Sequence, residues 1–78
     1  MQVIIFSWSD PDLLEKHKLP FKQNEKLDVP NSTLAEGAAL NVVKTCFEAG
    51  LNVMLYRLPG RDIIWVCVDN KNFQQRQL

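Results

Sequence analysis

Two apolar segments joined by a Pro-Gly pair constrain the fold of this chain most strongly. Residues 51–58 (LNVMLYRL) and 62–69 (DIIWVCVD) alternate their side chains with a period of two, which is typical of β-strands. Pro59 and Gly60 lie between them, and this pair favours the two central positions of a type II turn. The sequence therefore predicts a β-hairpin that ends at residue 69.

A third apolar segment and one long amphipathic segment precede the hairpin. Residues 2–8 (QVIIFSW) are rich in β-branched and aromatic side chains, and they predict a strand that is apolar on both faces. Residues 32–49 place small and apolar side chains along one stripe with the helical period, and Gly50 follows where helices often end. Thr33 and Glu36 match the S/T-x-x-E capping box, so we expect them to close the start of this helix.

The segments between these elements predict a short helix and an irregular connection. Residues 10–17 (DPDLLEKH) begin with a capping residue and a proline, so we expect a helix that turns Leu13 and Leu14 inward and ends before Pro20. Residues 19–30 (LPFKQNEKLDVP) contain two prolines and isolated apolar side chains. We therefore expect them to form an irregular connection packed against the rest of the chain.

The order of the expected elements is β-α-α-β-β, and 78 residues suffice for one domain. We predict an α+β fold, a two-layer α/β sandwich in which a three-stranded sheet carries one long helix on one face. One small α/β domain is expected over residues 1–70, followed by a polar C-terminal tail over residues 71–78.

The residue types that carry catalysis and metal binding are sparse. Cys46 and Cys67 lie in apolar stretches, and two cysteines with one histidine are too few for a disulfide scaffold or a structural zinc site. His17, the sole histidine, falls at the end of the short helix, where a cation suits the helix dipole. No spacing around it specifies a catalytic triad. We predict that the protein is not an enzyme and that it holds no cofactor and no metal.

Charge and hydropathy narrow the range of partners. Nine basic and nine acidic side chains cancel, so the chain lacks the electrostatic attraction of a basic domain for nucleic acid. No segment reaches the ~18–20 consecutive apolar residues that span a bilayer, and the start lacks the basic region of a signal peptide. We expect a cytoplasmic protein with no membrane partner.

All of the expected strands carry large apolar side chains on both faces, which is more than one long helix covers. One cover for the second face is the chain itself, through residues 19–30 and the tail. The other is a second copy or a different protein. A core this small gains most from added cover, which favours self-association as a homodimer or the binding of a protein partner.

These features predict a small non-enzymatic interaction protein of the accessory, adaptor or inhibitor type, such as phages and mobile elements encode. The expected contact residues are aromatic side chains of the kind that interfaces use most, together with the arginines of the hairpin tip: Trp8, Tyr56, Trp65, Arg57 and Arg61. The alternative is a nucleic-acid-associated regulator, in which Arg57 and Arg61 contact phosphates from the basic hairpin tip.

Overall fold

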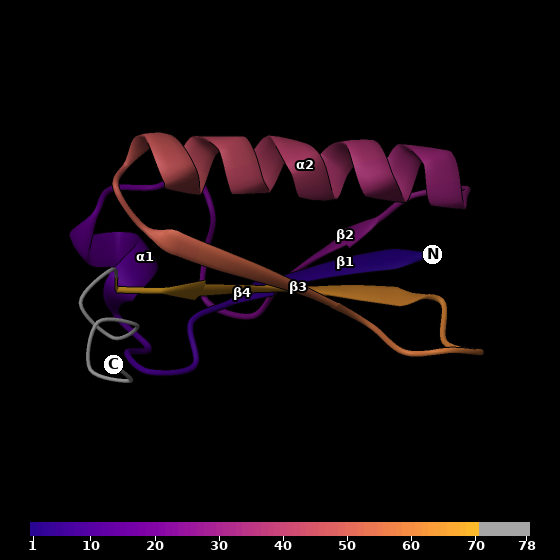
Figure 1. Ribbon diagram of the computed structural model, residues 1–78, viewed down its shortest axis with the longest axis horizontal. Helices are drawn as coiled ribbons and strands as arrows, with labels where there is room; N and C mark the ends of the chain where they lie inside the picture. Colours follow the sequence, from indigo (N-terminus) through magenta and orange to yellow (C-terminus); the bar gives the residue numbers. More distant parts are fainter. Residues whose placement is uncertain (71–78) are drawn as a thin grey trace.

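Two helices and four strands make up residues 1–70, the part of the chain that this computed structural model describes. In chain order they are β1 (Gln2–Phe6), α1 (Leu13–Lys16), β2 (Glu25–Asp28), α2 (Ser32–Glu48), β3 (Asn52–Arg57) and β4 (Ile63–Asp69). Figure 1 shows α2 lying along one face of the sheet and α1 at one end of the molecule. The predicted tail, residues 71–78, lies outside the described residues.

The strands form one mixed sheet in the order β2-β1-β4-β3. β3 and β4 are the predicted antiparallel hairpin, and the Arg61 N–H donates to the Leu58 carbonyl (3.2 Å) across its turn. Gly60 has a φ of +77°, which fits the third position of a type II turn. β1 runs parallel to β4 on one side and antiparallel to β2 on the other, so the first strand of the chain lies in the interior of the sheet.

The sheet has four strands, so the prediction of a three-stranded sheet is wrong. The additional strand, β2, falls in the segment predicted to be an irregular connection, and its sequence (EKLD) shows little apolar alternation. It forms because β1 offers an edge, along which Val3 pairs with Leu27 and Ile5 with Glu25. Just before it, the Glu25 N–H donates to the Lys22 carbonyl (3.0 Å), and this turn directs the chain back along β1.

The core lies between the sheet and α2. It is built from the branched aliphatic residues of the strands and from the predicted apolar stripe of the helix: Val3, Ile5, Ile64, Val66, Val68, Ala35, Ala39, Val42 and Cys46. Leu13 and Leu14 are buried in the same core, as predicted, although α1 is shorter than the helix expected over residues 10–17. Neither α1 nor α2 combines the length and the hydropathy that a membrane-crossing helix needs.

Both ends of α2 are closed by groups of this chain, but its start is not closed as predicted. The Asn31 Oδ1 accepts a hydrogen bond from the Leu34 N–H (2.9 Å), so the predicted capping box of Thr33 and Glu36 is wrong. Asn31 takes this role because it is the residue that still has extended backbone, with φ −151° and ψ 171°. At the other end Gly50 has a φ of +79°, which closes the helix as predicted.

Residues 19–30 pack against the core, as predicted, but on the face that α2 already covers. The side chains that join the core are Leu19, Phe21, Leu27 and Val29. On the opposite face, which we call the open face, lie the small, buried Cys67 and six larger side chains that alternate with the core residues along the strands: Ile4, Phe6, Met54, Tyr56, Ile63 and Trp65. None of these six belongs to the core that the described residues form.

Candidate interaction surface

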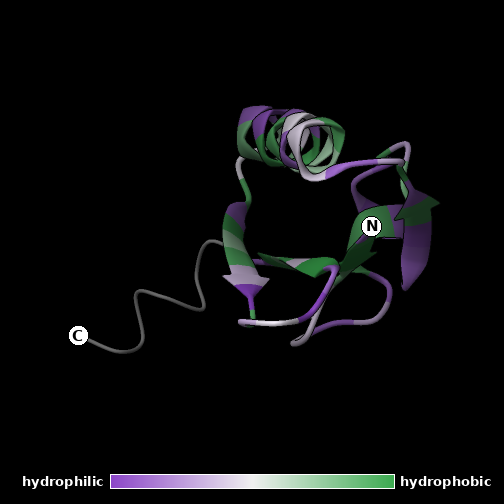
Figure 2. Cartoon of the chain, turned by 90° about the vertical axis from the view of Figure 1, so that its right-hand side faces the viewer, coloured by the Kyte–Doolittle hydropathy of each residue, from purple (hydrophilic) through white to green (hydrophobic). Residues whose placement is uncertain are grey.

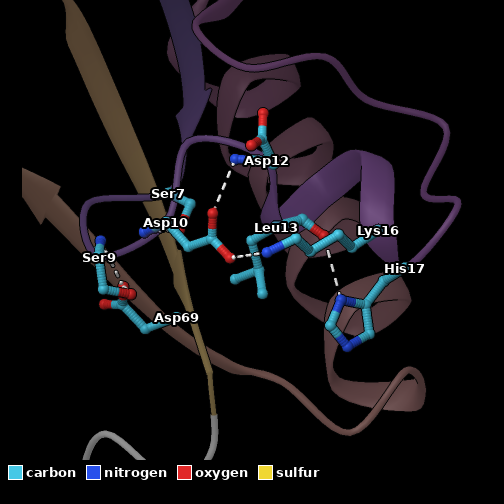
Figure 3. A network of polar contacts seen from close by, with 8 residues as sticks. All are labelled: Ser7, Ser9, Asp10, Asp12, Leu13, Lys16, His17 and Asp69. Carbon is cyan, nitrogen blue, oxygen red and sulfur yellow. Dashed lines mark hydrogen bonds and ion pairs between the residues drawn. The ribbon is translucent and has the colours of Figure 1, made fainter.

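The carboxyl ends of the parallel strands β1 and β4 meet at one end of the sheet, where polar contacts hold the loop that follows β1 (Figure 3). Asp69, at the end of β4, is 7% exposed. Its Oδ1 accepts hydrogen bonds from the Ser9 hydroxyl (2.8 Å) and the Ser9 N–H (3.3 Å), and its Oδ2 accepts one from the Cys67 thiol (3.5 Å). The carboxylate of Asp69 is therefore satisfied by donors of this chain and anchors the loop.

Asp10 organises the start of α1 beside this network. Its carboxylate accepts hydrogen bonds from the Asp12 N–H (3.0 Å) and from the Lys16 ammonium (2.9 Å). The bond from Lys16, and then the bond from Asp12, lower the pKa of Asp10, and the same carboxylate raises the pKa of Lys16. The His17 ring turns to its own helix, with Nδ1 3.0 Å from the Leu13 carbonyl oxygen. These contacts stabilise the short helix locally.

The two thiols have the environment of core residues. Burial raises the pKa of Cys46 to about 11, while burial and then the neighbouring Asp69 carboxylate raise the pKa of Cys67 to about 11. A nucleophilic cysteine needs a lowered pKa. Among residues 1–70, no three His, Cys, Asp or Glu side chains are grouped so that they could hold a metal ion. The polar end of the sheet therefore offers structural contacts and no activated thiol.

Large hydrophobic side chains that stay exposed gather on one side of the molecule. Eight such residues are exposed within residues 1–70: Trp8, Leu34, Leu40, Phe47, Met54, Leu55, Tyr56 and Leu58. Three of the eight lie on β3, one follows it directly, and two lie on the flank of α2 beside it. We call these six residues the β3 surface: Met54, Leu55, Tyr56, Leu58, Leu40 and Phe47. Phe47 is the most exposed of them, at 74%.

An ion pair shows which flank of α2 faces β3. One side of the helix carries four residues at spacings of four, three and four positions: Glu36, Leu40, Val43 and Phe47. The Arg57 Nη1 donates to the Glu36 Oε1 at 3.0 Å, which joins the end of β3 to this flank. Leu40 and Phe47 are therefore presented on the same side of the molecule as β3.

The two edge strands of the sheet differ in length and in charge. β2 has four residues, and three of them are charged: Glu25, Lys26 and Asp28. Charges on a short edge strand oppose pairing with other chains. β3 has six residues with one charge, Arg57, and no strand pairs with its outer edge within residues 1–70. In Figure 2 the β2 edge is hydrophilic (purple), whereas β3, at the opposite edge, carries hydrophobic residues (green).

The structure brings two of the five predicted contact residues side by side. Tyr56 lies opposite Trp65 in the register of β3 and β4, on the open face of the sheet. The Tyr56 hydroxyl donates to the Met54 Sδ (3.4 Å), and Trp65 is partly buried. Trp8, which is 73% exposed, follows the carboxyl end of β1. It therefore lies at the opposite end of the sheet from the hairpin turn.

The two arginines of the predicted basic tip are in different environments. The Arg57 guanidinium is partly exposed and paired with Glu36, which reduces its positive charge toward other molecules. Arg61 lies in the turn, where its N–H donates to the Leu58 carbonyl. Because Arg57 is paired with Glu36, the hairpin tip does not offer two unpaired guanidinium groups to a phosphate.

Reasoning from the sequence did not identify the helical part of the β3 surface. Leu40 and Phe47 are seven residues apart, about two helical turns, and both lie outside the alanine-rich stripe. That spacing was the available signal. Leu55 shares the α2 side of the sheet with Val53, but it is exposed because β3 is the edge strand, and only the strand order decides this.

The β3 surface is the candidate functional site that the described residues present. Comparisons with protein-family models, with curated proteins and with solved structures find no match to this chain.

Proposed function

We propose that this protein acts by protein–protein contact through the β3 surface. The observation that carries the proposal is that six of the eight exposed large hydrophobic side chains of residues 1–70 lie on β3, directly after it, or on the adjoining flank of α2. A large exposed apolar patch is typical of an interaction site, and aromatic residues and Met are enriched at interfaces. Burying such a surface is favourable by roughly 25 cal/mol per Å² of apolar area removed from water.

The chemistry of the polar end of the sheet supports contact over catalysis. Both thiols stay protonated at neutral pH, because each pKa is raised to about 11. The Asp69 carboxylate accepts hydrogen bonds from Ser9 and Cys67, and the His17 ring contacts its own helix. These groups are engaged in holding the fold, so they support a structural role at this end of the sheet.

The hairpin tip gives weaker support to a nucleic-acid-associated regulator. The charge of Arg57 is balanced by Glu36, and nine basic side chains of the chain are balanced by nine acidic ones. Binding to phosphates draws its affinity from the release of counterions by cationic side chains. A neutral chain with a paired arginine supplies little of that driving force, so we favour protein contact.

Site-specific photocrosslinking tests the proposed function. A benzophenone side chain is placed at Leu40, on the β3 surface, in cells that naturally make the protein. The matched control places it at Leu34, which is also exposed on α2 (52% against 62% for Leu40) but lies on the other flank. We expect crosslinked protein products from position 40 and far fewer from position 34. Equal yields from the two positions, or no product from either, would contradict contact through the β3 surface.

A further inference from the structure

Resting on the proposed function, we infer that the partner on the β3 surface is a second copy of this chain. The two copies pair along β3 in antiparallel fashion, around a two-fold axis at Leu55, so that two four-stranded sheets become one. The contact is made by the outer edge of β3, by the β3 residues on both faces of the sheet and by the facing flank of α2.

The outer edge of β3 offers backbone groups with which another strand can pair. In an antiparallel pair, alternate residues direct their N–H and C=O groups toward the partner strand and the others direct theirs away. Within residues 1–70, β3 pairs with β4 alone, so its outward groups face the edge of the sheet. A long edge strand with apolar residues invites pairing by another strand. The opposite edge, β2, is short and carries three charges, so it is a poor competitor.

The faces of the sheet restrict how two copies of β3 pair. A two-fold axis perpendicular to the sheet keeps each face on its own side, and residues directly opposite in an antiparallel pair share a face. The axis must therefore lie midway between one residue of β3 and the same residue of the second copy. Leu55 shares a face of the sheet with Val53, which packs against the core, whereas Met54 and Tyr56 lie on the open face. Leu55 and Met54 are the central residues of β3, so they are the two candidates for the axis.

An axis at Leu55 gives the more favourable set of cross-strand neighbours. Leu55 then faces Leu55 of the second copy, and Met54 faces Tyr56 of the second copy at two symmetric places. Sulfur–aromatic contacts of this kind are favourable, and cross-strand apolar pairs stabilise sheets. An axis at Met54 would instead set Asn52 opposite Tyr56. The apolar pairing therefore selects Leu55.

Charges on α2 complement one another under the same symmetry. A strand rises about 3.4 Å per residue, so the step of two residues from Arg57 to Leu55 covers about 7 Å along β3. A helix rises about 1.5 Å per residue, so the same distance along α2 corresponds to about four residues. Because Glu36 contacts Arg57, Leu40 lies level with Leu55 and the axis. Glu36 and Lys44 lie four residues to either side of Leu40. The axis therefore sets Glu36 of one copy level with Lys44 of the second copy.

No like charges oppose this pairing along β3. Arg57 is the one charged residue of the strand, and the two-fold axis sets it opposite Val53 of the second copy. The net charge of the chain is zero, so two copies do not repel one another as whole molecules. A self-complementary apolar edge, opposite helix charges and a neutral chain together favour a second copy over an unrelated partner.

Charge reversal at position 55 tests both the partner and the register. The mass of the purified protein is measured by light scattering over a range of concentrations, for wild type, Leu55→Lys, Leu55→Glu and an equal mixture of the two variants. We expect wild type to be dimeric. Each variant places two like charges at the axis, so its dissociation constant should rise by about tenfold or more. The mixture should restore a one-to-one dimer. Leu34→Lys, the matched control on the other flank of α2, should stay dimeric.

A cysteine variant covers the case in which Leu55→Lys does not fold, which far-UV circular dichroism would show. Leu55→Cys should form a disulfide-linked dimer on mild oxidation, because the two introduced thiols face each other at the axis, whereas Leu34→Cys should not. Cys46 and Cys67 are buried, so they do not compete for oxidation. A monomeric wild type overturns the inference. So does equal loss of dimer in Leu55→Lys and Leu34→Lys, or a monomeric mixture of the two charge variants.

The crosslinking experiment distinguishes failure of this inference from failure of the proposed function. Products from position 40 with the mass of two chains agree with a second copy. Products that join this chain to a protein of another mass would overturn the inference while leaving contact through the β3 surface intact.

Discussion

At the scale of single residues, the glycines within and just after α2 have opposite roles. Gly37 lies in the helix interior on the exposed side, and a Cβ added there would meet no atom within 4 Å. Gly50 closes the helix in the left-handed region, where its N–H donates to the Phe47 carbonyl and the next N–H, of Leu51, donates to the Cys46 carbonyl (3.1 Å). The conformational freedom of glycine is therefore used at position 50 and not at position 37.

We predict that Gly37→Ala raises the free energy of unfolding by about 0.5–1 kcal/mol, because alanine restricts the unfolded chain and fits the helix without a clash. The matched change Gly50→Ala should lower it by about 1 kcal/mol, because alanine is strained at a φ of +79°. Urea denaturation of the three proteins checks both values. Changes of the same sign in the two variants would contradict this account of α2.

At the scale of elements, the loop after β1 is tied to two different segments. The Ser7 N–H donates to the Gln23 Oε1 (2.9 Å), and the Gln23 Nε2 donates to the Ser7 carbonyl (3.0 Å), which joins the loop to the segment before β2. The two bonds from Ser9 to Asp69 join the same loop to the end of β4. These contacts connect segments that are far apart in sequence, so the loop holds α1 against the core.

Ser9→Ala should lower the free energy of unfolding by about 1–3 kcal/mol, because the buried Asp69 carboxylate loses its shortest hydrogen bond. Ser32→Ala, an exposed serine in the first turn of α2, should change it by no more than about 0.5 kcal/mol. Thermal and urea denaturation provide the measurement. If the two serine variants were equally stable, the Ser9 hydroxyl would not be an anchor of the loop.

At the scale of the whole molecule, the sheet has one face packed under α2 and one open face with partly exposed aromatic residues. The core of residues 1–70 rests on small and medium side chains, among them Ala35 and Ala39. A domain of this size buries only about 60% of its unfolded surface, so added cover contributes a large share of its stability. Pairing along β3 would extend the sheet and cover part of the exposed apolar surface.

Stability should therefore depend on protein concentration. Association of the folded state alone stabilises it by mass action, and we expect the wild-type Tm to rise by about 2–5 °C for each tenfold increase in concentration. The Tm of Leu55→Lys should depend less on concentration over the same range, because its dimer is weaker. Differential scanning calorimetry at several concentrations checks this, and a constant wild-type Tm would argue against a dimer.

The hairpin and α2 were predictable because their signals are local. Pro59 and Gly60 specify the turn from within four residues, and the stripe of α2 repeats over the whole helix. β2 was not predictable, since its strand conformation depends on the edge that β1 presents and not on its own side chains. The capping box was wrong for a local reason, because Asn31 caps the helix through the Leu34 N–H and the helix therefore begins before Thr33.

The candidate site was predicted in part. Tyr56 is the one predicted contact residue that belongs to the β3 surface, and no property of the sequence indicated that β3 would be an edge strand or that Leu40 and Phe47 would lie beside it. The sequence by itself determined the alternating faces of the strands and the buried stripe of α2, because these depend on the periodicity of apolar residues. Only the tertiary structure decided which apolar residues stay exposed, because exposure depends on which strand of the sheet is left without a neighbour.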